Sequence, residues 1–157
     1  MLDNASIKCW GYGKYGQLGL GENKKEKRPI SDPINLGSGR NAKAIVTGNS
    51  HTCAILDNSS IKCWGLNDSG QLGQGDTDSR GDEPDQMGDF LPSIDLGSGK
   101  TARAISAGDS HTCAILDNSS IKCWGKNDSG QLGLGDNSTR GGGGGSGEMD
   151  NLTSISL

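Results

Sequence analysis

Five cysteines and two histidines are the side chains of this 157-residue sequence with the most scope for chemistry. They recur in one context, because the same fifteen letters, HTCAILDNSSIKCWG, occupy residues 51–65 and 111–125. In the first copy, His51 and Cys53 share one face of an extended chain, and Cys63 follows ten residues after Cys53. Thiols at this spacing can form a disulfide, stay reduced, or join a histidine on zinc. Three ligands without a fourth make zinc the weakest of these interpretations.

The cysteine spacing predicts a β-hairpin. The segments TCAIL at 52–56 and SIKCW at 60–64 alternate as strands do, and Asp57-Asn58-Ser59 between them is typical of a tight turn. In this register Cys53 lies directly opposite Cys63. A directly opposed pair without ladder hydrogen bonds has Cα atoms about 4.5 Å apart, which is within the range of a disulfide.

We therefore favour two hairpin disulfides over reduced thiols or a metal site. They are Cys53–Cys63 and, by repetition, Cys113–Cys123. The fifth cysteine, Cys9, has no partner strand in the sequence before it and is predicted to be an orphan thiol. Disulfides are typical of an oxidising compartment.

The histidines do not indicate catalysis. Both stand at the same position of the repeat, at His51 and His111, whereas a catalytic site needs different groups that converge on one point. Identical residues in successive units are typical of a scaffold. We therefore predict that the protein is not an enzyme, with no catalytic residues, no metal ligands and no cofactor.

The elements that must position these residues are short strands in a repeating array. The distance from His51 to His111 is 60 residues, and a period of this size indicates units that bury their faces against one another. Residues 42–48 and 102–108 supply one more strand candidate for each unit. No segment sustains the periodicity of a helix. The predicted fold class is all-β.

Composition agrees with this fold class. Only 31% of the residues are hydrophobic, one is Phe, and 27 are Gly, which suits short strands joined by tight turns better than one large core. The net charge of −4 argues against a nucleic-acid partner. No apolar run is long enough to cross a membrane.

Three short motifs identify a family resemblance. They are GxxHTCAI at 48–55 and 108–115, KCWG at 8–11, 62–65 and 122–125, and GQLGxG at 16–21, 70–75 and 130–135. Together they resemble the repeat of the regulator of chromosome condensation family. The resemblance implies β-propeller blades of four antiparallel strands, within a seven-bladed propeller. It also implies that the histidine and tryptophan of each repeat are largely structural.

The chain holds about two and a half to three such blades. The expected units are about 1–50, 51–110 and 111–157, with a Gly-rich loop at 141–147. Because the first unit opens without its GxxHTCA strand, we expect a segment of a larger propeller that continues further or assembles with other copies. Cys9 would then pair with a cysteine from outside these residues. The lack of a signal peptide in residues 1–20 fits this expectation.

Asn-X-Ser/Thr glycosylation signals support an extracellular location. Those at hairpin tips are the best candidates, and those in the NDSG turns rank lower because the turns can pack against a neighbouring blade. The tip positions are Asn4, Asn58 and Asn118, the turn positions are Asn67 and Asn127, and the others are Asn137 and Asn151.

From the sequence we predict a non-catalytic, secreted or cell-surface propeller segment that serves as a structural scaffold or binds a protein or carbohydrate partner. The alternative is an intracellular regulator of the same family, located in the nucleus or cytoplasm. It would promote guanine-nucleotide exchange or act at chromatin.

Overall fold

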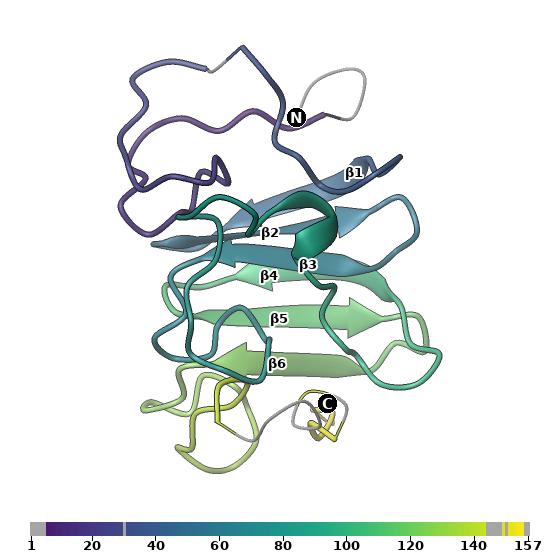
Figure 1. Cartoon of the computed structure of the whole chain (residues 1–157). Coiled ribbons are helices and arrows are strands. Elements are labelled where there is room, and N and C mark those ends of the chain that lie inside the picture. The colour runs from purple at the N-terminus through teal and green to yellow at the C-terminus, as the bar shows by residue number, and fades with distance from the viewer. Residues whose placement is uncertain (1–5, 30, 144–148, 150, 156–157) are drawn as a thin grey trace.

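The computed structural model describes residues 6–29, 31–143, 149 and 151–155. Within them, six strands form two three-stranded antiparallel sheets that follow each other along the chain (Figure 1). The first sheet contains β1 (Ala42–Thr47), β2 (His51–Leu56) and β3 (Ile61–Gly65), and the second contains β4 (Ala102–Ala107), β5 (His111–Leu116) and β6 (Ile121–Gly125). The described helical structure is one 3₁₀ turn, η1 (Gly88–Phe90). The all-β prediction is confirmed.

The register of each hairpin follows from its turn. Cys53 lies opposite Cys63, and Ile55 lies opposite Ile61. The loop closes because the Leu56 N–H donates to the Ser60 carbonyl oxygen over 2.9 Å. The second hairpin repeats this register residue for residue, so its cysteines are also opposed.

Each sheet has three regular strands where the family resemblance implied four. At the expected fourth position, Gly65 and Arg80 form a single antiparallel bridge, with N···O distances of 2.7 and 3.1 Å. Gly125 and Arg140 form the same bridge in the second unit. The residues between the two bridge partners form turns at glycines with positive φ. Only one residue returns to the edge of the sheet, so a regular fourth strand does not form there.

The two faces of β2 are buried against different neighbours. Cys53 and Ile55 belong to a hydrophobic cluster shared with the second sheet. Ala54 and Leu56 point the other way, into a cluster shared with the segments before β1. The following-unit partners include Leu96, Ala102, Leu116 and Trp124, and the preceding partners include Ile7, Ile34 and Leu36. Both faces being covered explains why every residue of β2 is buried.

In β5 the same residues alternate in burial. Leu116 is 1% exposed, whereas the neighbouring Ile115 is 41% exposed. In the part of the chain that the structure describes, no further sheet packs on the face that carries Ile115. The identical sequence is thus fully buried or half-buried according to its neighbours.

Candidate functional site

The four hairpin cysteines are bonded as their spacing predicts. Cys53 joins Cys63 and Cys113 joins Cys123, each with a Cα–Cα distance of 4.1 Å. Cys9 is free and partly buried, and this burial raises the pKa of its thiol. The thiol of Cys9 is therefore protonated at neutral pH and is a weak nucleophile.

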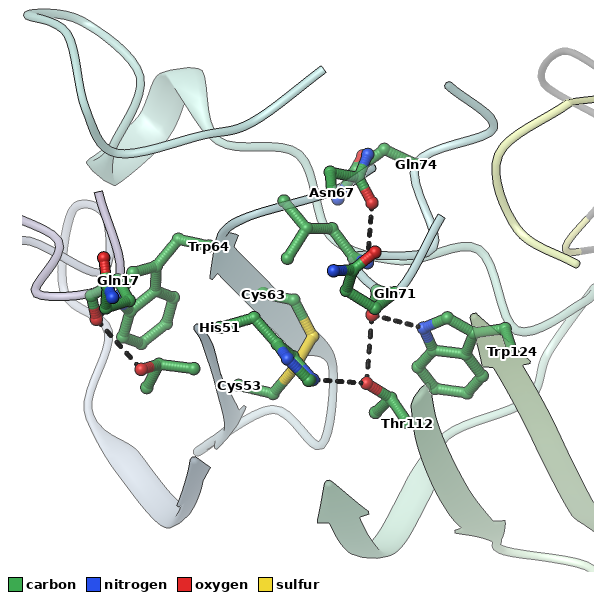
Figure 2. The surroundings of a disulfide bond; sticks show 12 residues. Gln17, His51, Cys53, Cys63, Trp64, Asn67, Gln71, Gln74, Thr112 and Trp124 are labelled. Carbon is green, nitrogen blue, oxygen red and sulfur yellow. Dashed lines mark hydrogen bonds between the residues drawn. A yellow bond between two sulfur atoms is a disulfide. The ribbon is translucent and has the colours of Figure 1, made fainter. Parts of the chain in front are cut away.

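The repeated histidine belongs to a buried latch between the two units (Figure 2). His51 is 1% exposed, and its Nε2 lies 3.0 Å from Oγ1 of Thr112 in β5. The Thr112 hydroxyl donates its only proton to the carbonyl oxygen of Gln71, over 2.9 Å. The Thr112 oxygen must therefore accept from His51, which places the imidazole proton on Nε2.

The repeated tryptophan completes the latch. The Trp124 indole N–H donates to the same Gln71 carbonyl oxygen, over 3.0 Å. The preceding unit repeats this arrangement, because Thr52 Oγ1 and Trp64 Nε1 both donate to the carbonyl oxygen of Gln17, at 2.9 and 3.1 Å. We call these groups the inter-unit latch: one Gln carbonyl that accepts from the Thr and Trp of the next unit.

Two glycines of the family motifs are required by the latch. A Cβ on Gly48 would collide with the ring of His51 and with the carbonyl oxygen of Gly108. A Cβ on Gly73 would lie 2.8 Å from Nε1 of Trp124, and the φ of +66° at Gly73 is also unfavourable for other residues. The GxxH and GQLG motifs therefore make room for the histidine of their own unit and the tryptophan of the next one.

The environment of His51 keeps its ring neutral. Burial, and then the nearby His111, lower the pKa of His51 to about 4. Nδ1 has no hydrogen-bond partner among the described residues, so a second proton there would have no acceptor. A neutral, hydrogen-bonded imidazole of this kind supports structure and is a poor proton carrier near pH 7.

A second buried contact, made by a lysine outside the latch, was missed by the sequence analysis. Lys62, in the KCWG motif, is only 7% exposed. Its Nζ donates to the carbonyl oxygens of Leu36 at 3.0 Å and Gly88 at 2.6 Å. Burial lowers the pKa of this ammonium group. The period-two alternation of the strand could have indicated that Lys62 faces inward, but its carbonyl partners lie in loops without a sequence pattern.

The described residues contain no cluster of metal ligands. No group of three His, Cys, Asp or Glu side chains could hold a metal ion there. The zinc alternative at His51, Cys53 and Cys63 conflicts with the structure, because both cysteines are bonded to each other and His51 binds Thr112. No helix in the described ranges meets the length and hydrophobicity required to span a membrane.

The structure separates the glycosylation signals by exposure. Asn67 and Asn127 are 0% exposed, and their side-chain amides donate to the carbonyl oxygens of Asp76 and Asp136 over 2.9 Å. Asn4 lies outside the described residues. The exposed signals are Asn58 and Asn118 at the hairpin tips, Asn137 and Asn151.

A surface groove of about 460 Å³ lies beside β1 and β2. Its rim carries Trp10 and Tyr12, which are 56% and 49% exposed. His51 and Cys9 also line it. Exposed aromatic side chains suit the binding of a partner, whereas the neutral histidine and the protonated thiol offer no activated nucleophile.

Sequence comparison extends the pattern to known proteins. Two profiles of the regulator of chromosome condensation (RCC1) repeat match, one at residues 42–71 and 102–131 and the other at 9–55 and 63–115. The ultraviolet-B receptor UVR8 of Arabidopsis thaliana is 33% identical over 135 residues, which cover 85% of this chain and 28% of the receptor. The regulator of chromosome condensation of Drosophila melanogaster is 37% identical over 128 residues, covering 79% of this chain and 21% of that protein.

A third relative is the guanine nucleotide exchange factor SRM1 of Saccharomyces cerevisiae. It is 30% identical over 146 residues, covering 76% of this chain and 30% of SRM1. The chain thus spans less than a third of the length of each of these three relatives. Among solved structures, Prp20p of Saccharomyces cerevisiae, studied with its binding to Gsp1p and histones, superposes with a TM-score of 0.68 at 24% identity, covering 97% of this chain and 34% of Prp20p.

Proposed function

The chain belongs to the regulator of chromosome condensation (RCC1) repeat family and forms part of a β-propeller, and from this premise we propose that it is a non-catalytic scaffold that binds a protein or carbohydrate partner outside the cell. The observation that carries the proposal is the inter-unit latch. It uses the side chains that could otherwise do chemistry, His51, Thr112 and Trp124, to hold one unit against the next. What is left for a partner is the surface of loops and grooves.

The extracellular part of the proposal is supported by the disulfides. Both cysteine pairs are bonded within their hairpins. In the reducing cytosol such pairs would stay as free thiols. The exposed glycosylation signals at Asn58 and Asn118 agree with passage through the secretory pathway. The division into units 1–50, 51–110 and 111–157 stays a prediction.

A second candidate is an intracellular regulator that promotes nucleotide exchange. The similarity to the yeast exchange factor SRM1 favours it. It requires a reducing compartment, in which the same cysteines would be free thiols. The redox state of the cysteines in native protein therefore discriminates between the two candidates.

The scaffold proposal predicts that the four hairpin cysteines are protected from labelling. Alkylation of denatured, unreduced protein from its native source, followed by mass spectrometry, is expected to leave Cys53, Cys63, Cys113 and Cys123 unmodified. After reduction, five cysteines should be labelled, because the two disulfides release four thiols. Five labelled cysteines before reduction would favour the intracellular candidate instead.

The exposure of the asparagines predicts which of them carry glycans. Asn58 and Asn118 are expected to be occupied in natively sourced protein, because both lie at exposed hairpin tips. Asn67 and Asn127 are expected to be empty, because their side chains are buried and hydrogen-bonded. Glycopeptide mapping measures all four. Empty tips would remove this support for secretion, and glycans on Asn67 or Asn127 would contradict the burial.

A further inference from the structure

The same groove occurs at one repeat position in two successive units, in different sizes. The first groove has a volume of about 540 Å³ and is lined by residues 19–22, 32–35, 83–85, Met87 and Phe90. The second has a volume of about 300 Å³ and is lined by residues 73–75, 92–93, Asp95 and Met149. Gly19 and Gly73 are equivalent in the GQLG motif, so the grooves can be compared directly.

The two grooves share their scaffold and differ in their chemistry. The first is lined by four carboxylate side chains, whereas Asp95 is the single carboxylate on the second among its described lining. The four are Glu22, Asp32, Glu83 and Asp85. Between the bridge arginine and the groove methionine, the chain reads GDEPDQ at residues 81–86 beside the first groove, and GGGGGSGE at 141–148 beside the second. Units that repeat their structural residues letter for letter have thus diverged at this groove.

The acidic turn is held in place by a side chain of its own. Oε1 of Gln86 accepts three successive backbone N–H groups, from Gly81 at 2.8 Å and from Asp82 and Glu83 at 3.2 Å each. This side-chain amide orders the turn that carries Glu83 and Asp85. The carboxylates are therefore presented by a defined backbone.

The turn that carries the apolar part of the groove is also held by hydrogen bonds. Phe90 is 72% exposed, although the two residues before it are fixed. Lys62 binds the carbonyl oxygen of Gly88 at 2.6 Å, and the Ser38 N–H donates to Asp89 Oδ1 at 2.8 Å. An exposed phenyl ring on a fixed turn, in a groove that Met87 also lines, offers an apolar contact to a partner.

The charges around the groove decide which partner fits. Lys24 forms an ion pair with Glu22 at 2.8 Å. Among the described residues, no other cation forms an ion pair with a carboxylate of the groove. The next residue, Lys25, lies over the ring of Tyr12 instead. The carboxylates of Glu83 and Asp85 are exposed and unneutralised by such a pair. This negative rim repels phosphate groups and attracts cationic ones.

We propose that this acidic groove, lined by Glu22, Asp32, Glu83, Asp85 and Phe90, docks a cationic peptide segment of a partner protein. An apolar side chain of the segment packs against Phe90, and flanking lysines or arginines face the carboxylates. The inference rests on the proposed scaffold function and names the chemistry of its partner. It assigns the contact to the first groove and not to the second.

The test uses the whole chain and two labelled peptides in fluorescence anisotropy. The probe is Lys-Arg-Leu-Lys-Arg, and its neutral counterpart is Gln-Gln-Leu-Gln-Gln. The cationic peptide is expected to bind at least about tenfold more tightly at low salt, and the difference should shrink when the ionic strength exceeds about 0.3 M. Equal binding of the two peptides would overturn the proposal.

Matched variants separate the groove from net charge. Glu83→Gln with Asp85→Asn is expected to weaken binding about fivefold, because two rim charges are lost. Asp78→Asn with Asp109→Asn removes the same charge from exposed positions outside the groove lining and should change affinity less than about twofold. If the two double variants weaken binding equally, net charge alone explains the binding, and the proposal of a docking groove is wrong.

The apolar contact has its own control. Phe90→Ala is expected to weaken binding about threefold or more, whereas Ile115→Ala, at an exposed hydrophobic position outside the groove lining, should leave it unchanged. Thermal unfolding of every variant checks that it stays folded. If the peptide does not bind while the four hairpin cysteines are protected from labelling, the groove proposal fails and the extracellular scaffold proposal stands.

Discussion

Replacing Trp64 by alanine is expected to lower the free energy of unfolding by about 3–5 kcal/mol. The indole is 0% exposed and packs in the cluster that joins the first sheet to the segments before it. Its N–H donates to Gln17, and Gly19 leaves room for the ring edge. The substitution would therefore leave a cavity and remove one donor from a buried carbonyl. Urea unfolding followed by circular dichroism measures the loss.

The repeat supplies a matched control for this substitution. Trp10 occupies the same position of the KCWG motif but is 56% exposed. Trp10→Ala is expected to cost less than about 1 kcal/mol. Trp64→Phe should cost about 1 kcal/mol for the lost hydrogen bond, together with a smaller packing loss. Equal losses at Trp10 and Trp64 would show that the latch does not stabilise the fold.

The second large effect is a fall in stability between pH 6.5 and pH 4. The pKa of His51 is lowered from 6.5 to about 4 in the folded protein, so below pH 6.5 the unfolded chain binds a proton that the folded chain rejects. Proton uptake by the unfolded state favours unfolding, and the contribution of the neutral ring is lost progressively as the pH falls through this window. The expected loss is about 3 kcal/mol by pH 4.

Substitution of each histidine isolates the cause. His51→Gln should flatten the dependence of unfolding free energy on pH in this window, whereas His111→Gln should retain most of it, because His111 is less buried. Carboxylates such as Asp57 and Asp89 have pKa values lowered by Arg40 and Ser38 respectively, so they lose their contribution at lower pH. An unchanged slope in His51→Gln would contradict the assignment.

The strands and the disulfides could be predicted because their signals are local. Alternation placed the strands within a residue or so of their observed limits, and the spacing of Cys53 and Cys63 fixed the register that brings them together. The fourth strand could not be rejected from sequence. Its place is taken by a one-residue bridge at Arg80. The number of residues that pair with the sheet edge depends on the conformations of the turn glycines between Gly65 and Arg80.

The latch could be predicted only in part. The repetition of His51 indicated a structural role, which the latch supports. Its partners could not be identified, because Thr112 lies 61 residues away and the common acceptor is a backbone carbonyl, Gln71, whose side-chain type carries no signal. The acidic groove could not be predicted from the sequence for a similar reason. Its carboxylates come from three segments that meet only after the units have stacked.

The alternation within β2 limits how such a protein can change its length. His51, Cys53 and Ile55 contact the following unit, while Thr52, Ala54 and Leu56 contact the preceding one. Deleting one residue inside the strand would exchange these two sets and place each side chain before the wrong neighbour. Loops such as residues 81–87 escape this constraint, which fits their divergence between units. The array can therefore grow by duplicating whole units, as the two identical fifteen-residue copies illustrate, but not by adding residues to a strand.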